Sequence, residues 1–133
     1  MSAPTLDGDV LIDLWLDDMR PAPVGWLHVK TVEDAKPHLA AGRVRNASLD
    51  HDLGACDVCM GGKTAEQWLV ESNYTRMPNC EHFGTGYTLI CWMEETGHWP
   101  QEVPSIHTAN PVGRQKMSAA IARELRNGRW ARP

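Results

Sequence analysis

The chain has 133 residues, a formal net charge of −4 at pH 7, and 42% hydrophobic and 23% charged residues. This length predicts a single domain, 1–133, large enough to bury a core without disulfides. A mildly acidic chain is not expected to bind nucleic acid strongly, and no stretch resembles a signal peptide or a membrane span. We therefore expect a cytoplasmic protein whose four cysteines stay reduced.

Strand and helix patterns alternate along the chain. The predicted strands cover 11–16, 25–30, 44–50 and 103–108, and the predicted helices cover 31–41, 64–72, 87–96 and 111–128. This alternation predicts an α/β fold of three layers with a mostly parallel sheet of about four strands. Ligands of such sheets bind beyond the carboxyl ends of the strands. Segment 55–84 has little strand patterning and is interpreted as an insertion.

Two helices have clear start signals. Thr31 to Asp34 resembles a capping box, although Pro37 should kink this helix or move its start. Asn110 before Pro111 combines a good N-cap with proline at the first helical position. Apolar spacing predicts these core residues: Trp26, Val29, Leu89, Ile90, Met93, Met117, Ile121 and Leu125.

Carboxylates gather where the first and third predicted strands end. Asp17 and Asp18 follow the first strand, and Asp50, His51 and Asp52 end or follow the third. Acids held this close repel one another unless a cation neutralises them, and carboxylates suit Mg²⁺. The predicted Mg²⁺ ligands are Asp17, Asp18, Asp50 and Asp52. Asp50 can instead act as a nucleophile toward phosphorus, and solvated turns are the structural alternative.

The stretch after the fourth strand offers groups that suit a phosphate. A helix beginning at Pro111 directs free N–H groups at the same sheet edge, and Arg114 lies in its first turn. His107 can donate a proton to a leaving alkoxide. We expect Thr108, Asn110 and Arg114 to bind phosphate. The predicted catalytic residues are Asp50, His51, His107 and Arg114. A hydrogen-bonded structural histidine and a surface arginine are the alternatives.

Two ligand pairs lie in the insertion. Cys56 and Cys59 form a CxxC motif, and Cys80 and His82 form a second pair. Four such ligands suit tetrahedral Zn²⁺, and with all four positions taken the zinc is structural. We therefore interpret 55–84 as an inserted zinc-binding flap. Unrelated thiols or a redox CxxC are the alternatives.

Four motifs, in this order along residues 11 to 120, resemble the cyclic-phosphate-processing receiver-like domain family. They are Leu16–Pro21, Ser48–Gly54, Thr85–Tyr87 and His107–Arg114. The resemblance implies a receiver- or flavodoxin-like fold and action on nucleotide-derived cyclic phosphates. It implies that Asp17 and Asp18 match the acidic pair of receivers, Asp50 the acceptor aspartate and Thr108 the hydroxyl residue. The fifth strand and lysine of a true receiver are not found in the pattern.

The leading interpretation is a metal-dependent phosphoesterase that acts on a small, nucleotide-derived cyclic phosphate. Its expected cofactors are Mg²⁺ at the acids and Zn²⁺ in the insertion, and its expected partner is the small phosphate-containing substrate. The alternative is a non-catalytic receiver-like module that accepts phosphate on Asp50 or binds a partner. A zinc-stabilised interaction domain with incidental acids is the third hypothesis.

Overall fold

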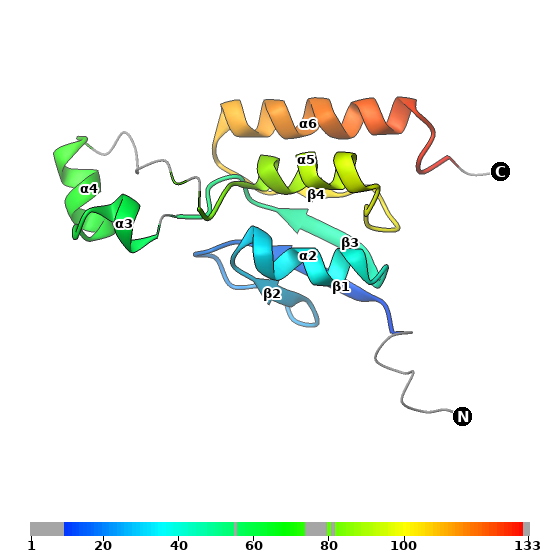
Figure 1. The fold of residues 1–133 in the computed structure, drawn as a ribbon, viewed down its shortest axis with the longest axis horizontal. Helices are drawn as coiled ribbons and strands as arrows, with labels where there is room; N and C mark the ends of the chain where they lie inside the picture. Colours follow the sequence, from blue (N-terminus) through cyan, green and yellow to red (C-terminus); the bar gives the residue numbers. More distant parts are fainter. Residues whose placement is uncertain (1–9, 55, 74–79, 81, 132–133) are drawn as a thin grey trace.

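A computed structural model of the chain describes residues 10–54, 56–73, 80 and 82–131. Four parallel strands form one sheet in the order β2-β1-β3-β4 (Figure 1). The strands are β1 (Ile12–Leu16), β2 (Leu27–Val29), β3 (Val44–Leu49) and β4 (Ser105–Ile106). The α/β fold and the parallel sheet are therefore confirmed, although the second and fourth strands are shorter than expected.

The helices of the main body pack side by side on the sheet (Figure 1). They are α2 (Val32–Ala40), α5 (Gly86–Thr96) and α6 (Pro111–Arg126). Their apolar residues meet Leu14, Leu16 and Leu49 of the sheet in one buried core. Two short helices, α3 (Asp57–Met60) and α4 (Ala65–Glu71), stand off beyond the end of β3. The sequence did not predict α3.

The two faces of the sheet differ in the described part of the chain. Leu14 and Leu16 of β1 are buried, whereas Asp13 and Trp15, which alternate with them along the strand, are half-buried. Side chains alternate between the faces of a strand, so Asp13 and Trp15 belong to the face opposite α2, α5 and α6. The three layers predicted from the sequence require helices on both faces of the sheet. In the described residues helices cover one face, and the expected third layer is not seen there.

Most core predictions are confirmed, and two are wrong. Val29 and the predicted residues of α5 are buried, as are Met117 and Ile121. Trp26 is half-buried and packs edge-on against Trp15. Leu125 lies in the last turn of α6 and is 47% exposed.

Pro37 does not move the start of α2. Thr31 caps the helix as predicted, its Oγ1 accepting from the Asp34 N–H at 3.1 Å, and the helix passes through Pro37 to Ala40. The fixed φ of proline is itself helical, so one lost N–H is tolerated.

The register of the sheet sets the position of the site. Leu16 pairs with Leu49, and Leu49 pairs with Ile106. The ladder continues by one step, because the Asp50 N–H donates to the Leu16 carbonyl and the His107 N–H to the Leu49 carbonyl. Residues that follow β1, β3 and β4 are therefore neighbours at one edge of the sheet.

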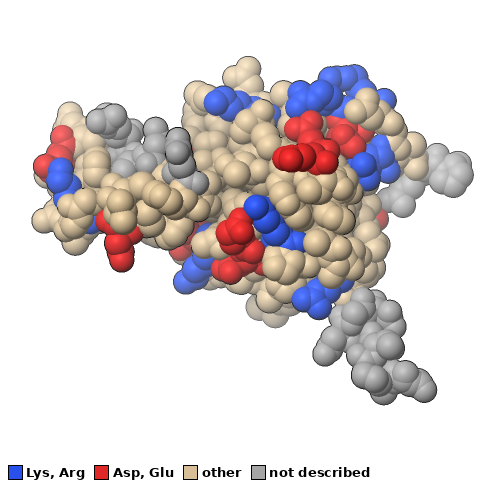
Figure 2. Space-filling model, viewed as in Figure 1, with Lys and Arg blue, Asp and Glu red and all other residues tan. Residues whose placement is uncertain are grey.

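Two further observations concern surface charge and helix length. Acidic and basic side chains are interspersed on the face shown in Figure 2, with both signs near one another. Among the described residues, no helix is both long enough and apolar enough to cross a bilayer.

Gly86 fixes the start of α5 against the end of β3. Its N–H donates to the His51 carbonyl at 2.9 Å. A Cβ at this position would overlap the carbonyl oxygen of Asp50 and lie 2.7 Å from the Met117 methyl group. Only glycine therefore allows this approach of helix to strand.

We predict that Gly86→Ala lowers the free energy of unfolding by roughly 1–3 kcal/mol, because a methyl group there must displace backbone. Urea denaturation measures the change. The exposed Ser118→Ala on α6 is the control and should stay within about 0.5 kcal/mol of the wild type. A Gly86→Ala variant as stable as the wild type would contradict this packing.

Candidate functional site

Three carboxylates converge at the carboxyl edge of the sheet. Asp17, Asp18 and Asp50 each offer an oxygen, and these oxygens lie within 4.8 Å of one another. Asp17 and Asp50 are buried. Oxygens bound to one Mg²⁺ lie about 3.0 Å apart when adjacent and about 4.2 Å apart when opposite. The three aspartates therefore fit a hard divalent cation after a small contraction.

Asp17 is held in place by two backbone N–H groups, by His107 and by Arg20. Its Oδ1 accepts from the N–H groups of Met19 and Arg20 at 2.8 and 2.9 Å, and its Oδ2 lies 3.0 Å from His107 Nε2. Burial alone would raise the pKa of Asp17, but these donors and the charge of Arg20 outweigh it, so the pKa is lowered. Asp17 is therefore an anion in the fold.

Of the three acids, Asp18 is the one whose ionised form is destabilised by its neighbours. Its pKa is raised, first by burial and then by repulsion from Asp17, Asp50 and Asp52. The turn after β3 packs closely on it, since a Cβ on Gly54 would lie 2.9 Å from Asp18 Oδ2. Gly54 also has a φ of +76°, which favours glycine.

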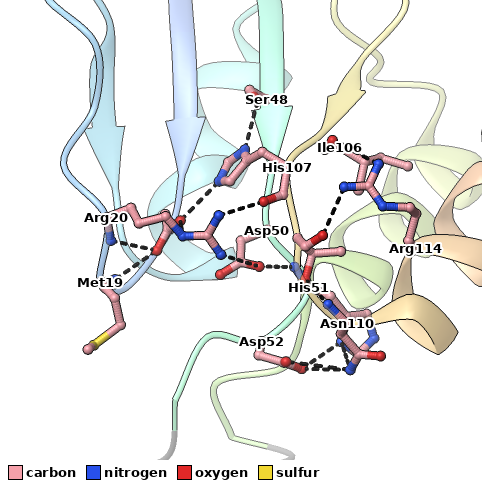
Figure 3. A network of polar contacts seen from close by, with 12 residues as sticks. Met19, Arg20, Ser48, Asp50, His51, Asp52, Ile106, His107, Asn110 and Arg114 are labelled. Carbon is pink, nitrogen blue, oxygen red and sulfur yellow. Dashed lines mark hydrogen bonds and ion pairs between the residues drawn. The ribbon is translucent and has the colours of Figure 1, made fainter.

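The guanidinium of Arg20 lies near both Asp17 and Asp50. The sequence did not predict a role for Arg20. Its Nε is 3.3 Å from Asp17 Oδ2, and its Nη2 is 3.8 Å from Asp50 Oδ1. Its Nη1 donates to the His107 carbonyl at 2.7 Å (Figure 3). The available signal was its place three residues after Asp17, in the turn that Asp17 caps.

His107 connects β3 to the acids. Its Nδ1 lies 2.7 Å from Ser48 Oγ and its Nε2 lies 3.0 Å from Asp17, while its ring stacks on Trp15 at 3.8 Å. Burial lowers the pKa of His107, although Asp17 partly offsets this. An ionised carboxylate only accepts, so Nε2 carries the proton and Nδ1 accepts from Ser48. Both ring nitrogens of His107 therefore have partners. The sequence did not predict the contacts of Ser48 and Trp15 with this ring, because they depend on the register of the strands.

His51 lies on the other side of Asp50, packed on the first turn of α6. Its Nδ1 is 2.8 Å from Asp52 Oδ1, and a Cβ on Gly113 would collide with its ring. Asn110 Nδ2 donates to both oxygens of Asp52 at 3.2 and 3.4 Å. The exposed Asp52 carboxylate is thus directed to His51 and Asn110, and it is not among the three acids brought together above.

Arg114, Thr108 and Asn110 lie beside β4, but their polar groups are partly used within the protein. Arg114 donates to the carbonyls of Ile106 and Thr108 at 3.3 and 2.8 Å. Thr108 is buried, and its hydroxyl accepts from the Asn110 N–H. Asn110 caps α6 by accepting from the Gly113 N–H at 2.9 Å. Their binding of phosphate stays a prediction.

A second cluster unites Cys56, Cys59, Cys80 and His82. His82 Nδ1 lies 3.3, 3.5 and 3.9 Å from the sulfurs of Cys56, Cys59 and Cys80, and the sulfurs of Cys56 and Cys80 are 3.6 Å apart. Around one tetrahedral zinc, two sulfurs lie about 3.8 Å apart and a sulfur and a nitrogen about 3.6 Å. The spacing therefore fits zinc.

The surroundings of Cys80 favour a thiolate. Burial raises its pKa, but the N–H groups of Cys56 and Phe83, each 3.4 Å from its sulfur, and contacts with His82 outweigh this and lower the pKa to about 6. Contacts with Cys56 and Cys80 raise the pKa of Cys59 to about 11. Thiols this close share protons, which a metal ion would displace.

We predict that Asp18→Asn stabilises the protein in the absence of Mg²⁺. Because the pKa of Asp18 is raised in the fold, its ionised form costs stability at neutral pH, and this cost disappears as the pH falls through that pKa. The variant should melt up to a few degrees higher without Mg²⁺ and should lose the stabilisation that Mg²⁺ gives the wild type.

The exposed Glu95→Gln on α5 is the control for this charge change. Thermal melts with and without Mg²⁺, in buffer that leaves zinc in place, make the comparison. A lower melting temperature for Asp18→Asn without Mg²⁺ would show that Asp18 is not repelled by its neighbours.

Comparison with known protein families identifies one match. Residues 12–123 match the family described as the cyclic-phosphate processing receiver domain. Searches of curated proteins and of solved structures each give no significant match. The matched segment includes β1 to β4, the three converging acids and the first thirteen residues of α6. The chain belongs to the cyclic-phosphate processing receiver domain family.

Proposed function

We propose that the chain is a metal-dependent phosphoesterase that hydrolyses a small, nucleotide-derived cyclic phosphate. The observation that carries this proposal is the convergence of Asp17, Asp18 and Asp50 beside the guanidinium of Arg20. The family supports a link to cyclic phosphates, and the site chemistry supports the hydrolytic step.

Charge explains how an anion can approach three acids. Three carboxylates and one guanidinium leave two negative charges, which one divalent cation neutralises. Asp17, Asp18 and Asp50 would hold Mg²⁺, which supplies charge neutralisation at a phosphoryl oxygen when bound. Without a cation the same acids would repel the substrate.

His51 is the better candidate for moving the proton. Asp52 holds its Nδ1 at 2.8 Å, and this orients the ring and fixes the tautomer. The described contacts of His107 occupy both of its nitrogens, so we assign it the positioning of Asp17. In the reaction, water adds to phosphorus and one ring P–O bond breaks. The water loses a proton and the released alkoxide gains one, so a cyclic diester gives a monoester with a free hydroxyl group.

Asp50 as phosphate acceptor remains the second candidate. It is buried directly after β3, and one of its oxygens already accepts from the His51 N–H at 2.8 Å. A phosphoryl group on Asp50 could be an intermediate of hydrolysis or the end state of a receiver-like module.

We predict that Asp50→Asn lowers turnover of cyclic phosphates by at least about 100-fold, because it removes a ligand charge or the nucleophile. Phosphorus NMR of a panel of nucleotide and sugar cyclic phosphates with Mg²⁺ measures ring opening. Asp13→Asn is the matched control, since Asp13 lies at the opposite end of β1 and pairs with Arg45. Full Mg²⁺-dependent activity of Asp50→Asn would contradict the mechanism. Stable labelling of Asp50 by acetyl phosphate without turnover would favour the receiver-like module.

We further propose that Cys56, Cys59, Cys80 and His82 hold one structural zinc. None of the described residues from 56 to 73 with an assigned side-chain exposure is buried, so α3 and α4 have no core of their own there. Small segments without a core depend on metal or disulfide cross-links. The ligands flank an antiparallel bridge between Asp52 and Thr85, where the insertion leaves and rejoins the body.

Zinc removal should unfold the insertion while the sheet stays folded. Cys80→Ser should lose the bound zinc, and backbone amides of α3 and α4 should exchange hydrogen with solvent at least tenfold faster, with β1 and β3 unchanged. Hydrogen exchange and metal analysis report both effects. Cys91→Ser on α5 is the control, because Cys91 lies outside the cluster. Equal protection of α3 and α4 with and without zinc would contradict a structural role.

A further inference from the structure

Arg20 has a geometry suited to binding a phosphate rather than only bridging acids. We propose that Arg20, and not Arg114, holds the phosphate of the substrate. This inference rests on the proposed function and adds the residue that selects an anionic ligand at the same site.

The guanidinium of Arg20 is fixed but only partly used. It donates through Nη1 to the His107 carbonyl at 2.7 Å, and its Nε lies 3.3 Å from Asp17. Its Nη2 is 3.8 Å from Asp50 Oδ1, which is too long for a hydrogen bond. A guanidinium has five N–H groups, and this side chain is 50% exposed. The Nη2 edge can therefore donate to a phosphoryl oxygen placed beside Asp50.

The alternative phosphate site, at the start of α6, has fewer unused N–H donors. Arg114 already donates from two nitrogens to the carbonyls of Ile106 and Thr108, and so fastens the helix to the edge strand. Pro111 has no N–H, and the Gly113 N–H is used by the Asn110 cap. Two of the first three positions of α6 therefore have no N–H to give to an anion.

The two possible roles of Arg20 predict effects of opposite sign on Mg²⁺. If Arg20 serves an arriving phosphate, removing its charge leaves the acids free and makes their surroundings more negative, so Mg²⁺ binds equally well or more tightly. Phosphate then binds less well because a charged donor is lost. If Arg20 only spaces the acids, its loss disturbs Asp17 and Asp50 and weakens the binding of both.

The experiment compares Arg20→Gln with the wild type in two titrations. Calorimetry measures Mg²⁺ affinity, and phosphorus NMR measures the affinity for inorganic phosphate at saturating Mg²⁺. Arg45→Gln is the matched control, because Arg45 is also 50% exposed and pairs with an aspartate of β1, at the opposite end of the sheet. Arg20→Lys keeps the charge and loses the planar fork, and it serves if Arg20→Gln does not fold.

We expect Arg20→Gln to weaken phosphate binding about tenfold or more with Mg²⁺ affinity unchanged or increased, and Arg20→Lys to weaken phosphate binding by a smaller factor. With a turned-over cyclic phosphate, KM should rise by more than kcat falls. Unchanged phosphate affinity, or a parallel loss of Mg²⁺ and phosphate, would overturn the inference while leaving the proposed function intact. A wild type that binds neither Mg²⁺ nor phosphate would overturn both.

Discussion

The hydrogen bonding of Asp17 is the constraint on which the site depends. A buried carboxylate is costly unless donors surround it, and here two backbone N–H groups, His107 and Arg20 supply them. With Asp17 ionised and fixed, the repulsion falls on Asp18, whose pKa is raised. A cation bound among the three acids would relieve this repulsion. The carboxylate of Asp17 also fixes the turn that carries Arg20, because it accepts from the N–H groups of Met19 and Arg20.

Close packing at glycines keeps the rest of the site in register. Gly54 allows the turn after β3 to approach Asp18, Gly86 allows α5 to reach the Asp50 carbonyl, and Gly113 makes room for the His51 ring. Beyond this packed edge the chain leaves at Asp52 and returns at Thr85. The cysteine and histidine cluster comes from the part of the chain between these two residues, so a metal bound there would cross-link that segment.

Much of this arrangement could be predicted from the sequence, because parallel strands share a carboxyl edge and their flanking residues become neighbours. The convergence of Asp17, Asp18 and Asp50 and the zinc-like cluster follow from strand order and ligand spacing. The roles of Ser48 and Trp15 depend on register, which periodicity alone does not determine. The sequence also did not predict the role of Arg20, because its side chain is oriented by the His107 carbonyl and the Asp17 carboxylate, whose positions follow only from the fold.

The sequence also did not predict that one face of the sheet lacks helices in the described residues, since an apolar run does not show which side a helix will cover.

The most direct test of the account is a crystal structure of the zinc-loaded protein grown with Mn²⁺, with anomalous difference maps that locate the ion. The account predicts a manganese peak bound by Asp17, Asp18 and Asp50, with zinc at the four ligands of the insertion. A manganese ion bound elsewhere, with Arg20 still covering unligated acids, would contradict it.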